Sequence, residues 1–428
     1  MSRQPKVLVI AEAANPEWVS VPLVGWSLAT ALRHVAEVHV VTHVRNRDAF
    51  LRAGEIEGET FTAIDNEALA RPLWRLGEML RMGQGKGWTA LQAVQALSYP
   101  SFERLVWRRF GAAIRAGKFD VVHRVTPLSP TISSPLAKRC ARAGVPFVLG
   151  PLNGGVPWPP GFESERRRER EWLSYLRGAY KLLPGRRATL RHASAVVVGS
   201  RHTQSEVPAH WRDKSVYIPE NAVDPARFST VAAPEGGVLR AGFVGRMVPY
   251  KGPDMLIEAA LPLLRAGRMR LEMVGDGPML EGLTGFSAAQ GVAEAVTFHG
   301  WLAHEEVQAV LGRCHLLSFP SVREFGGGVV LEAMALGVVP LIVDYAGPGE
   351  LVTEGLGWKV PLGTRDEIVA GFRAALQRAA QDPGALAPMA SAARARVAEA
   401  FTWARKAEQM RGVYDWVLGW EDKPAPFG

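Results

Sequence analysis

The strongest constraint on the fold is a repeating alternation of short apolar runs with longer amphipathic segments. The apolar runs end in Gly, Ser, Asn or Asp, which is typical of parallel strands joined by helices. Two series of such runs follow one another along the chain. The first covers residues 6–13, 37–43, 121–125, 146–152, 195–200 and 216–219, and the second covers residues 239–245, 271–275, 296–300, 316–320, 340–344 and 357–361. Each series is sufficient for one sheet, so the sequence predicts an α/β fold with two Rossmann-like domains.

The boundary between the two domains is predicted from the segment that separates the two series. A length of 428 residues corresponds to two or three domains. Residues 219–225 contain two prolines around a Glu-Asn-Ala turn, and Ala-Pro-Glu-Gly-Gly follows at 233–237, which is typical of an interdomain linker. We therefore expect domains at 1–219 and 220–401. A last helical pattern runs from Trp403 to Trp420, and we expect residues 402–428 to pack back onto the first domain.

Composition and segment length exclude several classes of protein. Hydrophobic residues make up 47% of the chain, charged residues 21%, and the mean hydropathy is +0.00, which excludes wholesale disorder and collagen-like repeats. Cys140 and Cys314 are too far apart for a zinc finger and too few for a disulfide framework. The first apolar run meets Glu12 before a signal-peptide core could form, and each long apolar segment is interrupted before it could span a bilayer. We expect a cytoplasmic protein.

The net charge of +8 is distributed unevenly along the chain. Residues 1–220 carry 31 Lys and Arg against 19 Asp and Glu, a net charge of +12, whereas residues 221–428 carry 19 against 23, a net charge of −4. The basic half is expected to meet an anionic partner. A phosphorylated ligand, a nucleic acid and a membrane surface all remain open at this point.

A glycine-rich segment at residues 320–335 is the densest candidate site. It follows an apolar run, and its three successive glycines open a predicted helix. Such glycines allow close approach of a ligand to the backbone, and a helix N-terminus favours an anion such as a diphosphate. Glu324 precedes the helix and Glu332 lies about one turn inside it, so both carboxylates can face one cleft and accept hydrogen bonds from sugar hydroxyls. The alternative is a strand-to-helix turn with solvated glutamates.

A second candidate segment, residues 242–252, also follows an apolar run. Its Arg246 and Lys251 flank a proline-containing turn at the expected carboxyl edge of the sheet, where two cations could clamp a diphosphate. Taken alone, the pair is as compatible with a solvated loop. The first apolar run of the chain is not followed by Gly-x-Gly-x-x-Gly, which disfavours a dinucleotide-dependent enzyme.

These segments, together with Val-Gly-Asp-Gly-Pro at 274–278 and Phe-His-Gly-Trp at 298–301, resemble the GT-B glycosyltransferases of glycosyltransferase family four in order and spacing. The resemblance is strong across residues 216–361 and extends to the Asn-Ala-Val-Asp-Pro-Ala-Arg-Phe linker and to Phe-Thr-Trp at 401–403. It implies two Rossmann-like domains facing a central cleft. It also implies a retaining, metal-independent transfer of a sugar from a nucleotide diphosphate donor.

By this resemblance, Arg246 and Lys251 bind the diphosphate, Glu324 contacts the donor sugar as a catalytic residue, and Glu332 binds the ribose. The donor site is completed by the backbone amides of Phe325, Gly326, Gly327 and Gly328. No metal or other cofactor is expected, and the sequence contains no Asp-x-Asp pair. Charge on the departing diphosphate would be stabilised by the two cations and by helix N-termini.

The sequence departs from the family pattern at three places. The family usually has an aromatic residue two positions after the first glutamate, where this chain has Gly326, and many members have Gly-Gly after the first strand, where this chain has Asn15-Pro16-Glu17. A His-x-His often ends an N-terminal strand in the family, whereas His123 here matches only the first position. Two interpretations of His123 stay open, a catalytic residue and a packed histidine at a strand end.

The first domain contains a candidate acceptor loop directly after a predicted strand. Asn153, Gly154 and Gly155 can turn backbone amides toward the cleft, and Trp158 can offer a flat face to a sugar ring. The alternative is a rigid proline-rich connector. Residues 163–187 follow, and their basic and aromatic residues would suit an interfacial helix on anionic lipid or, alternatively, a solvated helix with one face on the core.

The sequence therefore predicts a cytoplasmic hexosyltransferase, with possible peripheral contact to the membrane through its basic half. The expected acceptor is a glycan, a lipid-linked molecule or a small molecule, in envelope or exopolysaccharide synthesis. Two alternatives remain open. One is a nucleotide-sugar epimerase or hydrolase on the same fold, and the other is an inactive sugar-nucleotide sensor. Nucleic-acid binding is disfavoured because stacking aromatics are not interleaved with the basic residues.

Overall fold

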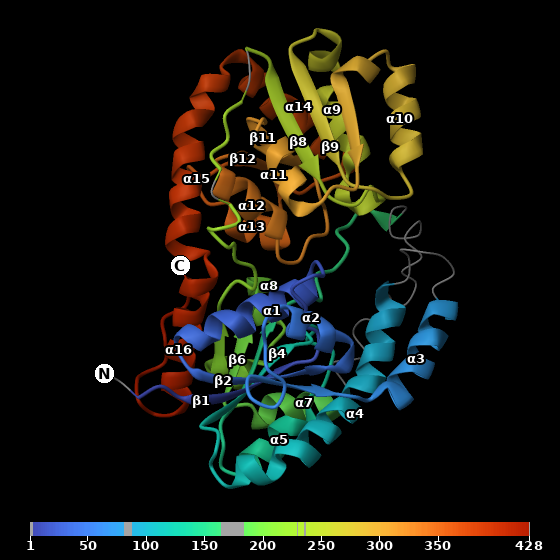
Figure 1. The fold of residues 1–428 in the computed structure, drawn as a ribbon. Helices are drawn as coiled ribbons and strands as arrows, with labels where there is room; N and C mark the ends of the chain where they lie inside the picture. The colour runs from blue at the N-terminus through green and yellow to red at the C-terminus, as the bar shows by residue number, and fades with distance from the viewer. Residues whose placement is uncertain (1–2, 81–87, 164–183, 229, 235–236, 428) are drawn as a thin grey trace. The chain divides into compact units, whose positions relative to one another are not determined.

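The computed structural model describes residues 3–80, 88–163, 184–228, 230–234 and 237–427. The described residues form two compact units. Unit 1 takes its residues from Met1–Gly155, Arg170–Glu220 and Trp403–Gly428, and unit 2 from Val156–Glu169 and Asn221–Thr402. Each unit has one parallel sheet with helices packed on it (Figure 1).

Unit 1 contains a seven-stranded sheet in the order β3-β2-β1-β4-β5-β6-β7. Its strands are β1 (Lys6–Ala11), β2 (Glu37–His43), β3 (Phe61–Ile64), β4 (Val121–Thr126), β5 (Phe147–Leu152), β6 (Ala195–Val198) and β7 (Ser215–Tyr217). Its helices are α1 (Val21–Ala31), α2 (Arg47–Arg52), α3 (Glu67–Leu80), α4 (Trp88–Arg115), α5 (Pro135–Arg142), α7 (Pro184–His192), α8 (Arg201–Ser205) and α16 (Trp403–Val417).

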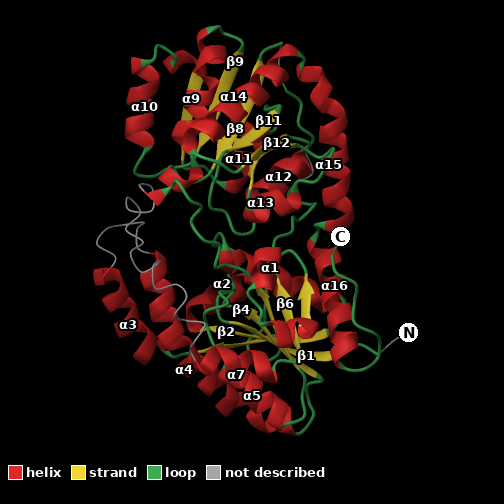
Figure 2. Cartoon of the chain, turned by 180° about the vertical axis from the view of Figure 1, so that it is seen from behind, coloured by secondary structure: helices red, strands yellow, loops and turns green. Residues whose placement is uncertain are grey.

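Alternate residues of β1 show how this sheet is buried on both faces. Leu8 and Ile10 belong to an apolar cluster that includes residues of α4, α5 and α7, whereas Val7 and Val9 belong to a second cluster with residues of α1 and α16. Figure 2 shows α1 and α16 side by side, in agreement with their packing contact. Both faces of a parallel sheet must be covered in this way, which explains why its strands are nearly continuous apolar runs.

Unit 2 contains a six-stranded sheet in the order β10-β9-β8-β11-β12-β13. Its strands are β8 (Leu239–Val244), β9 (Met269–Val274), β10 (Val296–Gly300), β11 (Leu316–Phe319), β12 (Val339–Asp344) and β13 (Trp358–Pro361). Its helices are α9 (Pro253–Arg265), α10 (Leu280–Ala289), α11 (His304–Leu311), α12 (Gly328–Leu336), α13 (Ala346–Leu351), α14 (Arg365–Gln381) and α15 (Ala387–Ala400). Helix α9 packs against α14 and α10, and α12 packs against α11, α13 and α15.

The predicted α/β architecture is confirmed, and each of the twelve predicted apolar runs overlaps a strand. The prediction missed β3, which has only four residues and lies at the edge of the first sheet. The predicted interfacial helix at 163–187 lies mostly outside the described residues. In the described part of the chain, no helix has both the length and the apolar character required to cross a bilayer.

Helix α16 completes the core of unit 1 although it comes from the opposite end of the chain. The Tyr414 hydroxyl donates to Nδ1 of His123 on β4 at 2.7 Å, and the other ring nitrogen, Nε2, donates to the Gly150 carbonyl at 2.6 Å. The buried Lys406 of α16 donates to the carbonyl of Pro219. Burial lowers the pKa of Lys406 to about 7 even though Glu220 raises it.

We expect His123 to make unit 1 less stable as the pH falls. Burial lowers the pKa of His123 to about 4, below the value of 6.5 for an exposed histidine, so the unfolded chain takes up a proton first. The resulting stability is present above pH 6.5 and is lost toward pH 4, with a loss of about 2 kcal/mol between pH 7 and pH 5. Urea unfolding at pH 7 and at pH 5 measures this difference in the free energy of unfolding.

The matched variant for this measurement is His123→Gln, which keeps an amide donor for Gly150 but does not titrate. Its unfolding free energy should fall less than that of the wild type between pH 7 and pH 5. An equal fall in the two proteins would show that the pKa of His123 is not depressed in the folded state.

Candidate functional site

The two glycine-containing segments singled out in the sequence lie next to each other at the carboxyl edge of the sheet in unit 2. Strands β8 and β11 are parallel neighbours, so the loops that follow them emerge side by side. The Val322 amide donates to the Tyr250 carbonyl at 2.9 Å, and the Ser321 hydroxyl donates to the same oxygen at 3.3 Å. Open parallel sheets bind their ligands at this edge.

Lys251 and Glu324 form an ion pair between these two loops. The Lys251 ammonium donates to Oε2 of Glu324, and the two side chains are 15% and 20% exposed, so a ligand can still reach them. The same ammonium lies 4.8 Å from the ring centroid of Phe319. The pair places one cation and one carboxylate together, which are the groups that a diphosphate and a sugar hydroxyl need.

Helix α12 begins directly after the Glu324 loop. Gly327 is its N-cap with φ 63°, and a Cβ at this position would lie 2.9 Å from Cδ1 of Leu351. This left-handed conformation and the close contact explain the need for glycine at this point. The first amides of α12 have no partner within the helix, and together with the helix dipole they favour an anion.

Glu332 lies on α12, and its carboxylate is 3.2 Å from Nε2 of His304, the first residue of α11. The hydrogen bond and the negative charge of Glu332 raise the pKa of His304. The ring of Phe228 contacts His304 edge-on at 5.5 Å. Sequence analysis found Glu332 but missed His304, although its place just after the Phe-His-Gly-Trp motif was a usable signal.

Arg246 is exposed in the loop that follows β8, and the structure explains the glycines of the neighbouring Val-Gly-Asp-Gly-Pro motif. A Cβ at Gly275 would lie 2.0 Å from the Gly245 carbonyl oxygen, and a Cβ at Gly277 would lie 2.6 Å from the Met247 carbonyl oxygen. The two loops therefore touch backbone to backbone, which leaves no room for side chains. This contact fixes the path of the chain on either side of Arg246.

His123 has the geometry of a packed histidine. Its side chain is fully buried, and both ring nitrogens are occupied by Tyr414 and Gly150. Depression of its pKa by burial keeps the ring neutral at physiological pH. These contacts favour the packed alternative over the catalytic one.

The predicted acceptor loop is divided between the two units. Asn153 is buried in unit 1, where its Oδ1 accepts hydrogen bonds from the Gly154 amide at 2.8 Å and the Ser200 hydroxyl at 3.0 Å. The carbonyl of Gly155 lies 3.0 Å from Nε2 of His202. Trp158, by contrast, groups with unit 2. The structure therefore does not bring Trp158 together with Asn153, Gly154 and Gly155 within one unit.

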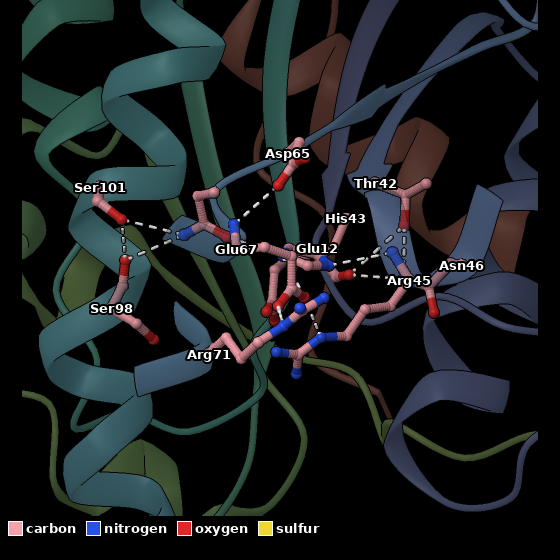
Figure 3. A network of polar contacts seen from close by, with 11 residues as sticks. Glu12, Thr42, His43, Arg45, Asn46, Asp65, Glu67, Arg71, Ser98 and Ser101 are labelled. Atoms are coloured by element: carbon pink, nitrogen blue, oxygen red, sulfur yellow. Dashed lines mark hydrogen bonds and ion pairs between the residues drawn. The ribbon is translucent and has the colours of Figure 1, made fainter. Parts of the chain in front are cut away.

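A polar network at the carboxyl edge of the sheet in unit 1 was missed by sequence analysis (Figure 3). Glu12 follows β1, His43 ends β2, and Asn66 follows β3. Nε2 of His43 donates to Oδ1 of Asn66 at 2.7 Å, and the Gln95 amide donates to Oε2 of Glu12 at 3.2 Å. Burial raises the pKa of Glu12 despite the opposing charges nearby.

The outer part of this network is an arginine cluster. Arg45 donates to Glu67, and Arg71 donates to the same carboxylate at 3.2 Å. The hydrogen bond from Arg45, together with its charge and the hydrogen bond from Arg71, lowers the pKa of Glu67 although burial opposes the shift. The signal available in the sequence was a polar residue directly after each apolar run. Among the described residues, no group of three or more His, Cys, Asp or Glu side chains is placed to hold a metal ion.

Comparison with known proteins finds similarity in sequence to one family, mainly in unit 2. Residues 232–394 match the family model described as glycosyl transferases group 1. The chain is 35% identical over 183 residues to D-inositol 3-phosphate glycosyltransferase of Gordonia bronchialis, a match that covers 40% of this chain and 39% of the relative. It is 34% identical over 214 residues to glycogen synthase of Mycobacterium tuberculosis, covering 49% and 51%. The chain thus spans about half the length, or less, of these curated relatives.

Solved structures resemble the whole chain. The Anabaena protein HepE in complex with UDP has a TM-score of 0.61 and 16% identity, and the match covers 95% of this chain and 98% of HepE. A glycosyltransferase from Rickettsia africae has a TM-score of 0.64 and 13% identity, with coverage of 97% and 99%. These likenesses confirm the α/β fold of GT-B glycosyltransferases. The similarity in sequence to the group 1 glycosyl transferases lies in residues 232–394.

Proposed function

We propose that the chain is a retaining, metal-independent hexosyltransferase that moves a sugar from a nucleotide diphosphate donor to a glycan, lipid-linked or small-molecule acceptor. The observation that carries the proposal is the Lys251–Glu324 pair beside the N-terminus of α12, within the residues that match the family model. HepE was solved with UDP and with UDP-glucose, which supports a uridine diphosphate sugar as the first donor to test.

The proposed step breaks the bond between the anomeric carbon and the diphosphate and forms a bond from that carbon to an acceptor oxygen on the same face of the ring. The acceptor hydroxyl gives its proton to an oxygen of the departing diphosphate. Lys251, Arg246 and the amides at the start of α12 stabilise the charge that develops on the diphosphate. Glu324 accepts hydrogen bonds from the donor sugar, and Glu332 accepts them from the ribose.

The acceptor and the location of the protein are also part of this proposal. An anionic acceptor fits the net charge of +12 in residues 1–220, and envelope or exopolysaccharide synthesis would supply such glycans. Cys140 and Cys314 are both free and buried, which fits a cytoplasmic location. Peripheral contact with an anionic membrane stays a prediction, and co-sedimentation with anionic vesicles at low salt tests it.

Nucleotide binding should stabilise the folded chain without a metal. We expect one of UDP, GDP and ADP to raise the melting temperature in EDTA, because a ligand at 100 times its Kd stabilises the native state by about 2.7 kcal/mol. Lys251→Ala should reduce this shift because one diphosphate contact is lost. If no nucleotide at millimolar concentration changes the melting temperature, the assigned donor site is wrong.

Turnover should depend on Glu324. With the donor sugar of the stabilising nucleotide, Glu324→Ala should lower kcat/KM by about 100-fold or more, since a charged partner of the sugar hydroxyls is removed. Glu281→Ala, an exposed change on α10, is the matched control and should keep the wild-type rate. Near-normal turnover in Glu324→Ala would refute its role. If the wild type binds a nucleotide but turns over none of the donors, an inactive sugar-nucleotide sensor is favoured. If the only product is an epimer or a hydrolysed sugar, a nucleotide-sugar epimerase or hydrolase is favoured.

Ribose binding at Glu332 should be visible as a change in the pKa of His304. The raised pKa of His304 depends on Glu332, so ribose hydroxyls that bind the same carboxylate should weaken this pair and lower the pKa of His304. An NMR titration of the imidazole with and without the stabilising nucleotide measures the change. Glu332→Gln should lower the pKa without ligand and remove the response to nucleotide. A wild-type pKa that stays the same when nucleotide binds would contradict the assignment.

A further inference from the structure

Trp158 makes its described contacts with the two loops that carry the Lys251–Glu324 pair. Its ring meets that of Tyr250 edge-on, with the centroids 6.0 Å apart and the planes at 90°. The guanidinium carbon of Arg323 lies 5.1 Å from the centroid of the Trp158 ring. Tyr250 immediately precedes Lys251, and Arg323 immediately precedes Glu324. The Trp158 ring therefore contacts the residue before Lys251 and the residue before Glu324.

Arg323 is held between two aromatic rings. Its side chain is buried, and its guanidinium carbon lies 5.5 Å from the centroid of Phe325 as well as against Trp158. A cation over aromatic faces is attracted to both, more strongly where water is excluded. Glu324 stands in the chain between Arg323 and Phe325, so these contacts lie on both sides of the catalytic candidate.

The loop after β12 also contacts the segment of Trp158 and the loop of Glu324. The Tyr345 hydroxyl donates to the carbonyl of Pro157, the residue before Trp158, at 2.9 Å. Two residues further along, the Gly347 amide donates to the Glu324 carbonyl at 3.4 Å, and a Cβ on Gly347 would lie 2.1 Å from the carbonyl oxygen of Phe325. The segment that carries Trp158 thus contacts the loops after β8, β11 and β12.

We propose that Trp158 is a positioning residue for the donor site, which holds the Lys251 and Glu324 loops in the relative placement that the pair requires. The inference rests on the proposed function for its kinetic consequences, whereas the contacts that support it are independent of any donor. The alternative is the role of Trp158 as a stacking platform for the acceptor, which the sequence suggested. Displacement of catalytic groups by about 1 Å can lower a rate by about 100-fold, so loops without regular structure need such a restraint.

The first test is amide hydrogen exchange of the free protein. In Trp158→Ala, exchange should become faster in residues 246–252 and 321–327, because their common contact is removed. Trp158→Phe keeps an aromatic face and should restore most of the protection. Trp420→Ala, at an exposed tryptophan of unit 1, is the control and should leave both loops unchanged. Equal exchange of both loops in the wild type and Trp158→Ala would overturn the proposal.

The second test separates positioning from acceptor binding. UDP-glucose, or the hexose donor of whichever nucleotide stabilises the protein, is hydrolysed in the absence of acceptor. Trp158→Ala should lower kcat/KM for this hydrolysis by about 10-fold or more, with an unchanged KM for the acceptor in transfer assays, and Trp158→Phe should recover to within about 3-fold. Unchanged hydrolysis with a raised acceptor KM would show the acceptor platform instead and overturn the proposal.

These outcomes distinguish the inference from the proposed function. A wild-type protein that binds none of UDP, GDP and ADP and hydrolyses none of their hexose derivatives refutes the function, while hydrogen exchange still decides whether Trp158 restrains the two loops. An active wild type with normal exchange and hydrolysis in Trp158→Ala refutes the inference alone. A melting temperature measured for each variant shows that it is folded at the assay temperature.

Discussion

Parallel strands that are buried on both faces leave little room for polar side chains except at the ends of the strands. Helices cover both faces of the sheet in unit 1, and the strands β11 and β12 of unit 2 are buried along most of their length, so the groups that can meet a ligand gather in the loops that leave the carboxyl edge. Lys251 and Glu324 are 73 residues apart in the chain and nevertheless form an ion pair, because β8 and β11 are adjacent strands. The same constraint assembles Glu12, His43 and Asn66 at the ends of β1, β2 and β3.

Much of this architecture could be predicted because fully buried strands are continuous apolar runs. Strand β3 could not, since Phe-Thr-Ala-Ile is short and lies at an edge where half of the pairing is missing. Without β3 there was no reason to place Asn66 and Glu67 beside His43. The polar residues after the apolar runs were visible in the sequence, but the pairing of His43 with Asn66 could not be predicted without β3.

In the second unit, the individual residues were easier to predict than their partners. Lys251, Glu324 and Glu332 belong to recognisable motifs, but the pairing of Glu332 with His304 depends on how α11 packs against α12. Trp158 shows the opposite difficulty. Its neighbours in the sequence, Gly154 and Gly155, belong to unit 1, whereas its described contacts are with residues of unit 2. His123 was expected at a strand end but lies inside β4, where burial and two hydrogen bonds favour packing over chemistry.

The position of α16 has a consequence for the order in which the chain can fold during synthesis. Domains generally fold as units while the ribosome is still adding residues. Here Met410, Val413 and Tyr414 fill the face of the first sheet that also carries Val7 and Val9, so the earliest strand must wait for some of the last residues of the chain. Unit 2, whose residues end at Thr402, has all of its segments earlier. Until α16 is made, the part of this face that Met410, Val413 and Tyr414 cover stays exposed next to α1, and a chaperone can bind this apolar surface.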